Sequence, residues 1–74
     1  MIETVKIRGL YCQLDMSGRG FVYLVRKQHR VFVEMDPDLK AAISRDEDAW
    51  RREMLRLRGI AICQMRKLLG SRAK

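Results

Sequence analysis

The sequence predicts an α+β fold, in which a three- to four-stranded antiparallel β-meander is followed by a short helix and a long C-terminal amphipathic α-helix. Two observations support this prediction. Apolar and polar side chains alternate through short segments before residue 36, which is the pattern of half-buried strands. After residue 50 the apolar side chains instead recur every three or four positions, as on one face of a helix. A chain of 74 residues suits one domain, which we divide into a sheet (1–35), a short helix (37–43), a long helix (45–69) and a tail (70–74).

Three strands are predicted between residues 10 and 35, at 10–15, 21–26 and 30–35, with short turns between them. The first turn holds Gly18 and Gly20, which accept the positive φ angles that tight turns need. Strands joined by turns this short run antiparallel, as in a meander. Residues 2–8 are rich in β-branched side chains, so they are predicted to add a fourth strand or to continue into the next one.

Two helix starts are recognisable. Asp36 and Pro37 suit the N-cap and the first position of the short helix. Ser44 and Glu47 match the capping box S-x-x-E, so we expect them to begin the long helix. Within that helix, Gly59 costs about 1 kcal/mol relative to alanine. It could kink the helix, split it or admit a close neighbour.

The long helix carries two apolar stripes. The first is expected to cover the sheet and consists of Trp50, Met54, Leu57, Ala61, Met65 and Leu68. The second consists of Leu55, Ile62 and Leu69, and it lies roughly 100° or more from the first around the helix axis. One helix over a small sheet rarely buries both stripes, so the second predicts a homo-oligomer, with a dimer favoured. The alternative is that the sheet curls far enough to cover it.

The chain is basic, with 16 Lys+Arg against 9 Asp+Glu and a net charge of +7. Residues 36–49 are acidic, and the positive charge lies in the segments on either side of them. The acids at the start of the long helix are explained by the helix dipole, which favours negative charge there. The basic excess favours an anionic partner, either nucleic acid or an acidic protein surface.

Two basic constellations could contact phosphates. The first is made by turn residues, and the second is a stripe on the outer face of the long helix. The turn residues are Arg19, Arg26, Lys27 and Arg30, and the stripe is Arg52, Arg56, Arg66 and Lys67. Aromatic side chains on one sheet face could stack on bases, but with so few of them in the chain we expect Tyr11, Tyr23 and Phe32 to pack in the core.

No catalytic or metal-binding residues and no cofactor are predicted. The one histidine, His29, lies in a basic turn without a nearby acid, and Cys12 and Cys63 are too far apart for a ligand motif. Both cysteines are expected to be reduced, in a cytoplasmic protein without a signal peptide. The longest apolar run is far shorter than the ~20 residues of a membrane span. The long helix could also lie on a membrane surface, but the preceding sheet favours packing within the domain.

The leading hypothesis is therefore a small non-enzymatic protein that binds nucleic acid through its phosphates. The alternative is a protein-binding adaptor or inhibitor that docks on an acidic partner through the C-terminal helix. A three-stranded sheet followed by a helix resembles the DNA-binding domains at the front of phage-type integrases, and this resemblance in architecture implies DNA binding. The short Arg-rich chain is also typical in style of a protein from a phage or mobile element.

Overall fold

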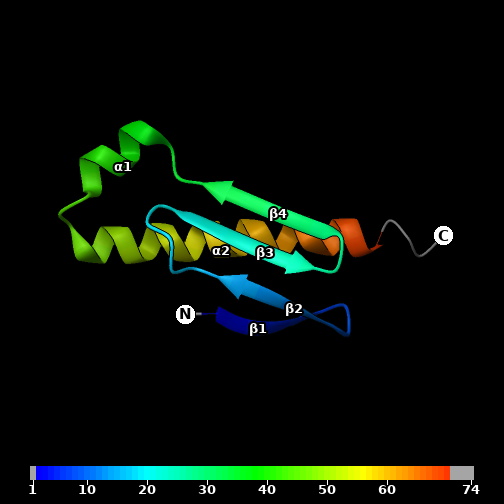
Figure 1. Ribbon diagram of the computed structural model, residues 1–74. Helices are drawn as coiled ribbons and strands as arrows, with labels where there is room; N and C mark the ends of the chain where they lie inside the picture. The colour runs from blue at the N-terminus through cyan, green and yellow to red at the C-terminus, as the bar shows by residue number, and fades with distance from the viewer. Residues whose placement is uncertain (1, 71–74) are drawn as a thin grey trace.

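The computed structural model describes residues 2–70, which form a four-stranded antiparallel sheet covered on one face by a long helix (Figure 1). The strands follow one another across the sheet in the order β1-β2-β3-β4. Their bounds are Ile2–Ile7 (β1), Leu10–Asp15 (β2), Phe21–Arg26 (β3) and His29–Glu34 (β4). A short helix, α1 (Pro37–Ile43), leads to the long helix α2 (Glu47–Gly70). The α+β meander predicted from the sequence is confirmed, and residues 2–7 form a fourth strand. The predicted tail beyond Gly70 lies outside the described residues.

Two tight turns set the register of the sheet. Arg8 and Gly9 join β1 to β2 with φ angles of 52° and 80°, as a type I′ hairpin turn requires. Lys27 and Gln28 join β3 to β4, and Lys27 also has a positive φ, of 52°. The strand after the second turn begins at His29, one residue earlier than expected, because His29 pairs with Arg26. Both turns lie at the same end of the sheet, since the strands alternate in direction.

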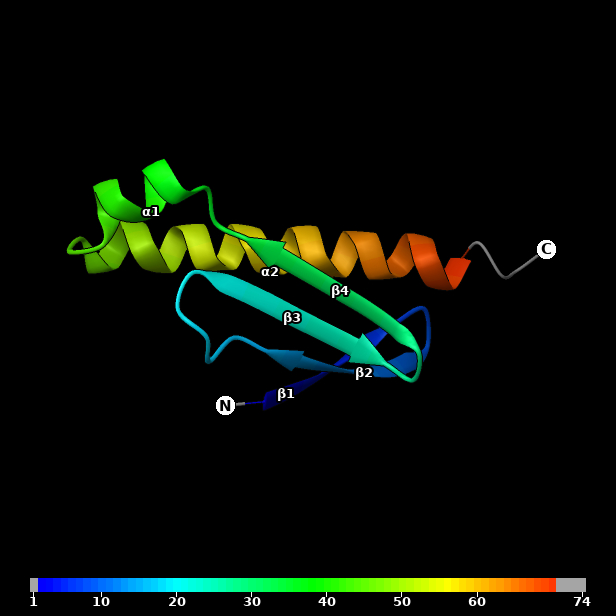
Figure 2. The same ribbon diagram turned by 45° about the horizontal axis from the view of Figure 1, so that its top comes forward.

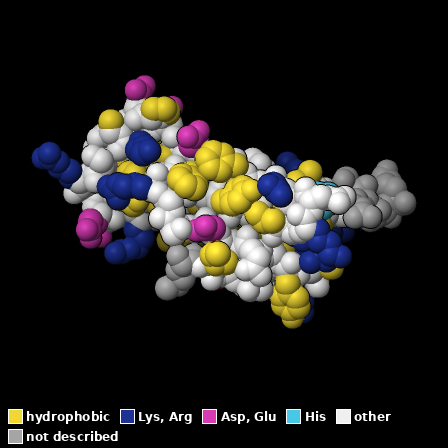
Figure 3. Space-filling view, viewed as in Figure 1, with side chains coloured by type: hydrophobic (Ala, Val, Ile, Leu, Met, Phe, Trp, Pro, Cys, Tyr) yellow, Lys and Arg dark blue, Asp and Glu magenta, His cyan; other side chains and the backbone are white. Residues whose placement is uncertain are grey.

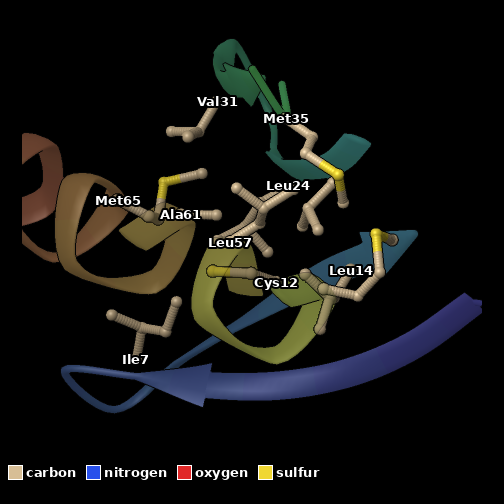
Figure 4. Close-up of a cluster of buried hydrophobic side chains, with 11 residues drawn as sticks. Ile7, Cys12, Leu14, Leu24, Val31, Met35, Leu57, Ala61 and Met65 are labelled. Carbon is tan, nitrogen blue, oxygen red and sulfur yellow. The ribbon is translucent and has the colours of Figure 1, made fainter. Parts of the chain in front are cut away.

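The core lies between the sheet and α2 (Figures 2 and 4). Alternate strand residues point into it, so each strand contributes one face to the core and leaves the other in solvent. Leu14 and Leu24 are paired across β2 and β3 and are fully buried. The buried apolar residues are Ile7, Cys12, Leu14, Val22, Leu24, Val31, Met35, Met54, Leu57, Ala61 and Met65.

The structure corrects the predicted start of the long helix. The side chain of Asp46, not that of Ser44, accepts a hydrogen bond from the Ala49 backbone N–H, at 3.1 Å. Ser44 instead ends α1, and its hydroxyl donates to the carbonyl of Ala41. The capping box is therefore wrong, and α2 begins at Glu47. The predicted cap of α1 is confirmed, because the Asp36 carboxylate accepts from the Asp38 and Leu39 backbone N–H groups.

The two apolar stripes of α2 also differ from the prediction. Leu68 is 39 % exposed and does not belong to the buried stripe, whereas Ile62 and Leu69 are half-buried against the core. A twisted sheet curves around the helix, and this allows α2 to bury residues well to the side of its central stripe. Leu55 alone of the second stripe is exposed, at 56 %. The predicted oligomer stays a prediction, and its proposed interface is reduced to Leu55 and its neighbours.

Gly59 neither splits nor ends α2, which is continuous from Glu47 to Gly70. A Cβ atom at Gly59 would meet nothing within 4 Å, so this part of the helix faces open space. Within residues 2–70, neither helix combines the length and the hydropathy that a membrane span needs.

Candidate nucleic-acid interface

Opposite charges are segregated along the molecule. All nine acidic residues lie in the half of the fold away from the two tight turns. Asp15 and Glu34 end β2 and β4, and Glu3 is near the start of β1. The others are in α1, its cap, or the first two turns of α2 with its cap: Asp36, Asp38, Asp46, Glu47, Asp48 and Glu53. On the face seen in Figure 3, acidic side chains accordingly appear only toward the α1 end.

The opposite end of the molecule is purely basic. Both tight turns meet the C-terminal end of α2 there, since the Arg8 side chain approaches Gly70 (Figure 1). We call this end the basic pole and define it by seven residues: Lys6, Arg8, Arg26, Lys27, Arg30, Arg66 and Lys67. The three ion pairs recorded among residues 2–70 all use other arginines, namely Arg51, Arg56 and Arg58. The positive charge of the pole is therefore not neutralised by the described acids.

Both turns of the basic pole place a long basic side chain where the backbone is strained. Arg8 and Lys27 have φ angles of 52°, in the left-handed region. Only glycine, asparagine and aspartate enter that region readily, and other L-residues there cost of order 1 kcal/mol. Both side chains are also exposed. Residues held in such conformations often serve a function that a better turn former would not serve.

The structure brings together only part of the predicted phosphate-binding set. Lys27, Arg30, Arg66 and Lys67 are exposed at the basic pole. Arg26 is also there, but its guanidinium donates a hydrogen bond to the Tyr11 carbonyl, at 3.0 Å. This contact holds β3 against β2 beyond the last backbone pair of their register, Gln13–Val25, so Arg26 has a structural task.

The other predicted residues lie in the acidic half. Arg19 lies over the Trp50 ring, at 4.0 Å, and donates to the Ser44 carbonyl at 2.9 Å. Arg56 pairs with Glu53, and the carboxylate raises the pKa of the guanidinium. Arg52 is exposed one turn earlier on the same helix. The predicted helical stripe is thus divided between an end beside the acids and an end at the basic pole.

Arg19 also borders a cleft of about 560 Å³ between the β2–β3 connection and the start of α2. Arg45 and Arg51 line it, but so does Glu47, and Arg51 pairs with Asp48. Arg19 is held by Trp50 and Ser44. Because an acidic side chain lines this cleft and two of its arginines already have partners, the cleft is a weaker anion site than the basic pole.

The face of the sheet opposite α2, here called the open face, borders the basic pole. The strand register arranges its side chains in rows that cross the sheet. The row nearest the pole holds Lys6 and Tyr11. The next holds Thr4, Gln13, Val25 and Arg30, and the third holds Ile2, Asp15, Tyr23 and Phe32.

The aromatic residues of the open face were expected in the core, and for Tyr11 and Phe32 this expectation is wrong. Tyr11 is 62 % exposed and Phe32 is 54 % exposed. Tyr23 is half-buried on the same face. The alternation of the strands, which places Tyr11 opposite Cys12 and Phe32 opposite Val31, already held the signal for this placement.

The aromatic side chains form two groups. The Lys6 ammonium lies 5.6 Å from the centre of the Tyr11 ring. On β3 and β4, Phe32 lies 5.2 Å from Phe21 and 6.3 Å from Tyr23, between ring centres. We call Phe21, Tyr23 and Phe32 the aromatic cluster, and hydrophobic side chains indeed gather over β3 and β4 in Figure 3. No family model, curated protein or solved structure matches this chain.

Proposed function

We propose that this protein is a non-enzymatic nucleic-acid-binding protein that contacts phosphates with its basic pole. The observation that carries the proposal is the segregation of charge. Seven basic residues share one end of the fold, while all nine acids lie in the other half. Such a field steers a polyanion to one end of the molecule.

Charge that serves only solubility is best interspersed in sign over the surface, and this chain departs from that arrangement. The strained positions of Arg8 and Lys27 add a second argument. Asparagine or glycine would form both turns at lower cost, so the basic side chains bring something other than stability. Arg66 and Lys67 complement the negative end of the α2 dipole and are therefore weaker support on their own.

The geometry also limits how a polyanion could lie. Arg52 and Arg56 are on the face of α2 away from the sheet, so they and the open face are on opposite sides of a two-layer domain. The basic pole borders both layers. A strand that begins at the pole can continue over the open face or along α2, but it cannot contact both faces in one straight run.

The proposal is tested by the salt dependence of binding to a fluorescent oligonucleotide. The variant Lys27→Asn/Lys67→Gln neutralises two charges of the basic pole without touching the open face. Each lost phosphate contact reduces the slope of log affinity against log salt by about one unit, so the double variant should lose up to about two units. Its affinity at low salt should fall about tenfold or more.

A matched control removes the same charge from the acidic half. In the variant Lys40→Gln/Arg45→Gln, net charge also falls by two, but both residues lie far from the tight turns. Its slope should stay near that of the wild type. Equal losses in the two variants would mean that net charge alone drives binding, and absence of binding by the wild type at low salt would exclude the function.

The second candidate function is a protein-binding adaptor that docks on an acidic partner through α2. One observation favours it: Leu55 is 56 % exposed, and the neighbouring Gly59 faces open space. A large apolar side chain beside a glycine suits a close-packed contact. In a pull-down after nuclease treatment, Leu55→Glu should abolish partner capture, whereas it should leave oligonucleotide binding unchanged.

A further inference from the structure

We propose that the open face of the sheet binds single-stranded nucleic acid by stacking unpaired bases on Tyr11 and on the aromatic cluster. This inference rests on the proposed function and names the form of nucleic acid that the protein takes. Its basis is the occurrence of exposed aromatic rings and unpaired basic groups in neighbouring rows of one face.

Exposure of the aromatic rings is the first step of the argument. Tyr11 and Phe32 keep more than half of their surface in solvent, although a core lies on the other side of the same strands. Exposed rings on a sheet offer flat surfaces on which bases stack irrespective of their sequence. Lys6 already occupies the neighbourhood of the Tyr11 ring, at 5.6 Å, and can neutralise the phosphate of a base stacked there.

The spacing of the two aromatic groups is the second step. Tyr11 and Phe32 are two strands and four residues apart in the register, which corresponds to about 16 Å across a sheet. The row between them holds Thr4, Gln13, Val25 and Arg30, so it is mostly polar and carries one positive charge. A strand of several nucleotides can therefore place one base at each aromatic group and a phosphate near Arg30.

The distribution of charge on the open face indicates the direction in which a bound strand crosses it. Lys6 and Arg30 lie in the two rows nearest the basic pole, whereas at the far edge Asp15 shares the third row with Tyr23 and Phe32, and Glu34 is paired with Phe21. Phosphates are favoured in the first rows and repelled at the far edge, so the strand enters from the pole and ends over the aromatic cluster. A duplex fits this face poorly, because its bases are already stacked on one another and are not available to the rings.

The test compares two single strands with one duplex in fluorescence-anisotropy titrations. The probes are a labelled oligouridylate, an oligothymidylate of equal length and a DNA duplex. Tyr11→Ala and Phe32→Ala should each weaken binding to both single strands by about tenfold, the loss expected for one stacked base. Binding to the duplex should change by less than about twofold. Tyr11→Phe keeps the ring and should keep the affinity.

Leu55→Ala provides the matched control. Leu55 is as exposed as Phe32, at 56 % against 54 %, but it lies on α2 in the other layer. Its removal should leave binding to all three probes unchanged. Circular dichroism confirms that each variant is folded before it is titrated.

Two results would overturn the inference while the proposed function stands. In the first, Tyr11→Ala and Phe32→Ala bind single strands as tightly as the wild type, although Lys27→Asn/Lys67→Gln does not. In the second, sedimentation without nucleic acid shows that the wild type self-associates and that Phe32→Ala is monomeric, so the open face binds a second copy of the chain. If the wild type binds none of the probes at low salt, the proposed function itself fails.

Discussion

At the scale of single residues, Lys27 lowers the stability of the fold, but it places a positive charge at the tip of a turn. Its φ of 52° is costly for lysine and is accepted by asparagine. The variant Lys27→Asn should therefore raise the free energy of unfolding by about 0.5–1 kcal/mol and at the same time weaken oligonucleotide binding. Urea denaturation measures the first effect and anisotropy the second. A variant that gains stability and loses no affinity would remove Lys27 from the interface.

The two cysteines should differ sharply in reactivity. Cys12 is buried in the core, and burial raises the pKa of its thiol, with a smaller opposing effect from the Arg26 guanidinium. The thiol therefore stays protonated at neutral pH and is shielded from reagents, whereas Cys63 is exposed. A thiol-labelling assay at pH 7.5 should modify one cysteine in the native protein and two in denaturant. Modification of both at equal native rates would show that the core opens readily.

Single residues also show what could be predicted from the sequence. The alternation of side chains places Leu14 on one face of β2 and Leu24 on one face of β3, and these are the faces that the core buries, because a strand in a two-layer fold has one buried face. The same alternation placed Phe32 on the opposite face from Val31. It could not decide which face α2 covers, so Phe32 was misassigned by its hydrophobicity.

At the scale of secondary-structure elements, the start of α2 is decided by Asp46. Its carboxylate accepts from the Ala49 N–H, while Ser44 belongs to the end of α1. Asp46→Ala should therefore lower the free energy of unfolding by about 1 kcal/mol, the usual value of an N-cap. Ser44→Ala should change it by less than about 0.5 kcal/mol. Thermal or urea unfolding distinguishes the two, and the reverse order would restore the capping box of Ser44 and Glu47.

The misassigned cap has a physical explanation. Ser44 and Asp46 are both good N-cap residues, and each has a suitable N–H three positions later. The choice between them depends on where α1 ends, and that end is set by tertiary contacts. Arg19 contributes one of these, because it reaches from the β2–β3 connection to the Ser44 carbonyl. A contact across 25 residues cannot be read from local spacing.

At the scale of the whole molecule, the basic pole arises from topology. Lys6, Lys27 and Lys67 are far apart in the sequence, and they share one end only because the hairpins and α2 finish there. The sequence indicates the basic turn and the basic helix face separately. It could not predict that Arg66 and Lys67 join the turn while Arg52 and Arg56 do not, since that depends on how α2 crosses the sheet.

The way α2 crosses the sheet also decides whether the second apolar stripe is an oligomer interface or part of the core. Ile62 provides the test. Ile62 is half-buried against the core of its own chain. Ile62→Ala should therefore cost about 1–2 kcal/mol, less than the 2–5 kcal/mol of a fully buried isoleucine, and this cost should be the same at every protein concentration. Leu55→Ala should change stability by less than about 0.5 kcal/mol.

Thermal unfolding over a hundredfold range of protein concentration makes the measurement decisive. In an obligate dimer the melting temperature rises with concentration, because association stabilises only the folded chain. A wild-type melting temperature that rises in this way, with the rise abolished by Leu55→Ala, would assign the outer face of α2 to self-association. A constant melting temperature, with only Ile62→Ala destabilised, would mean that the twisted sheet buries Ile62 within one chain. Leu55 would then be left for a different partner.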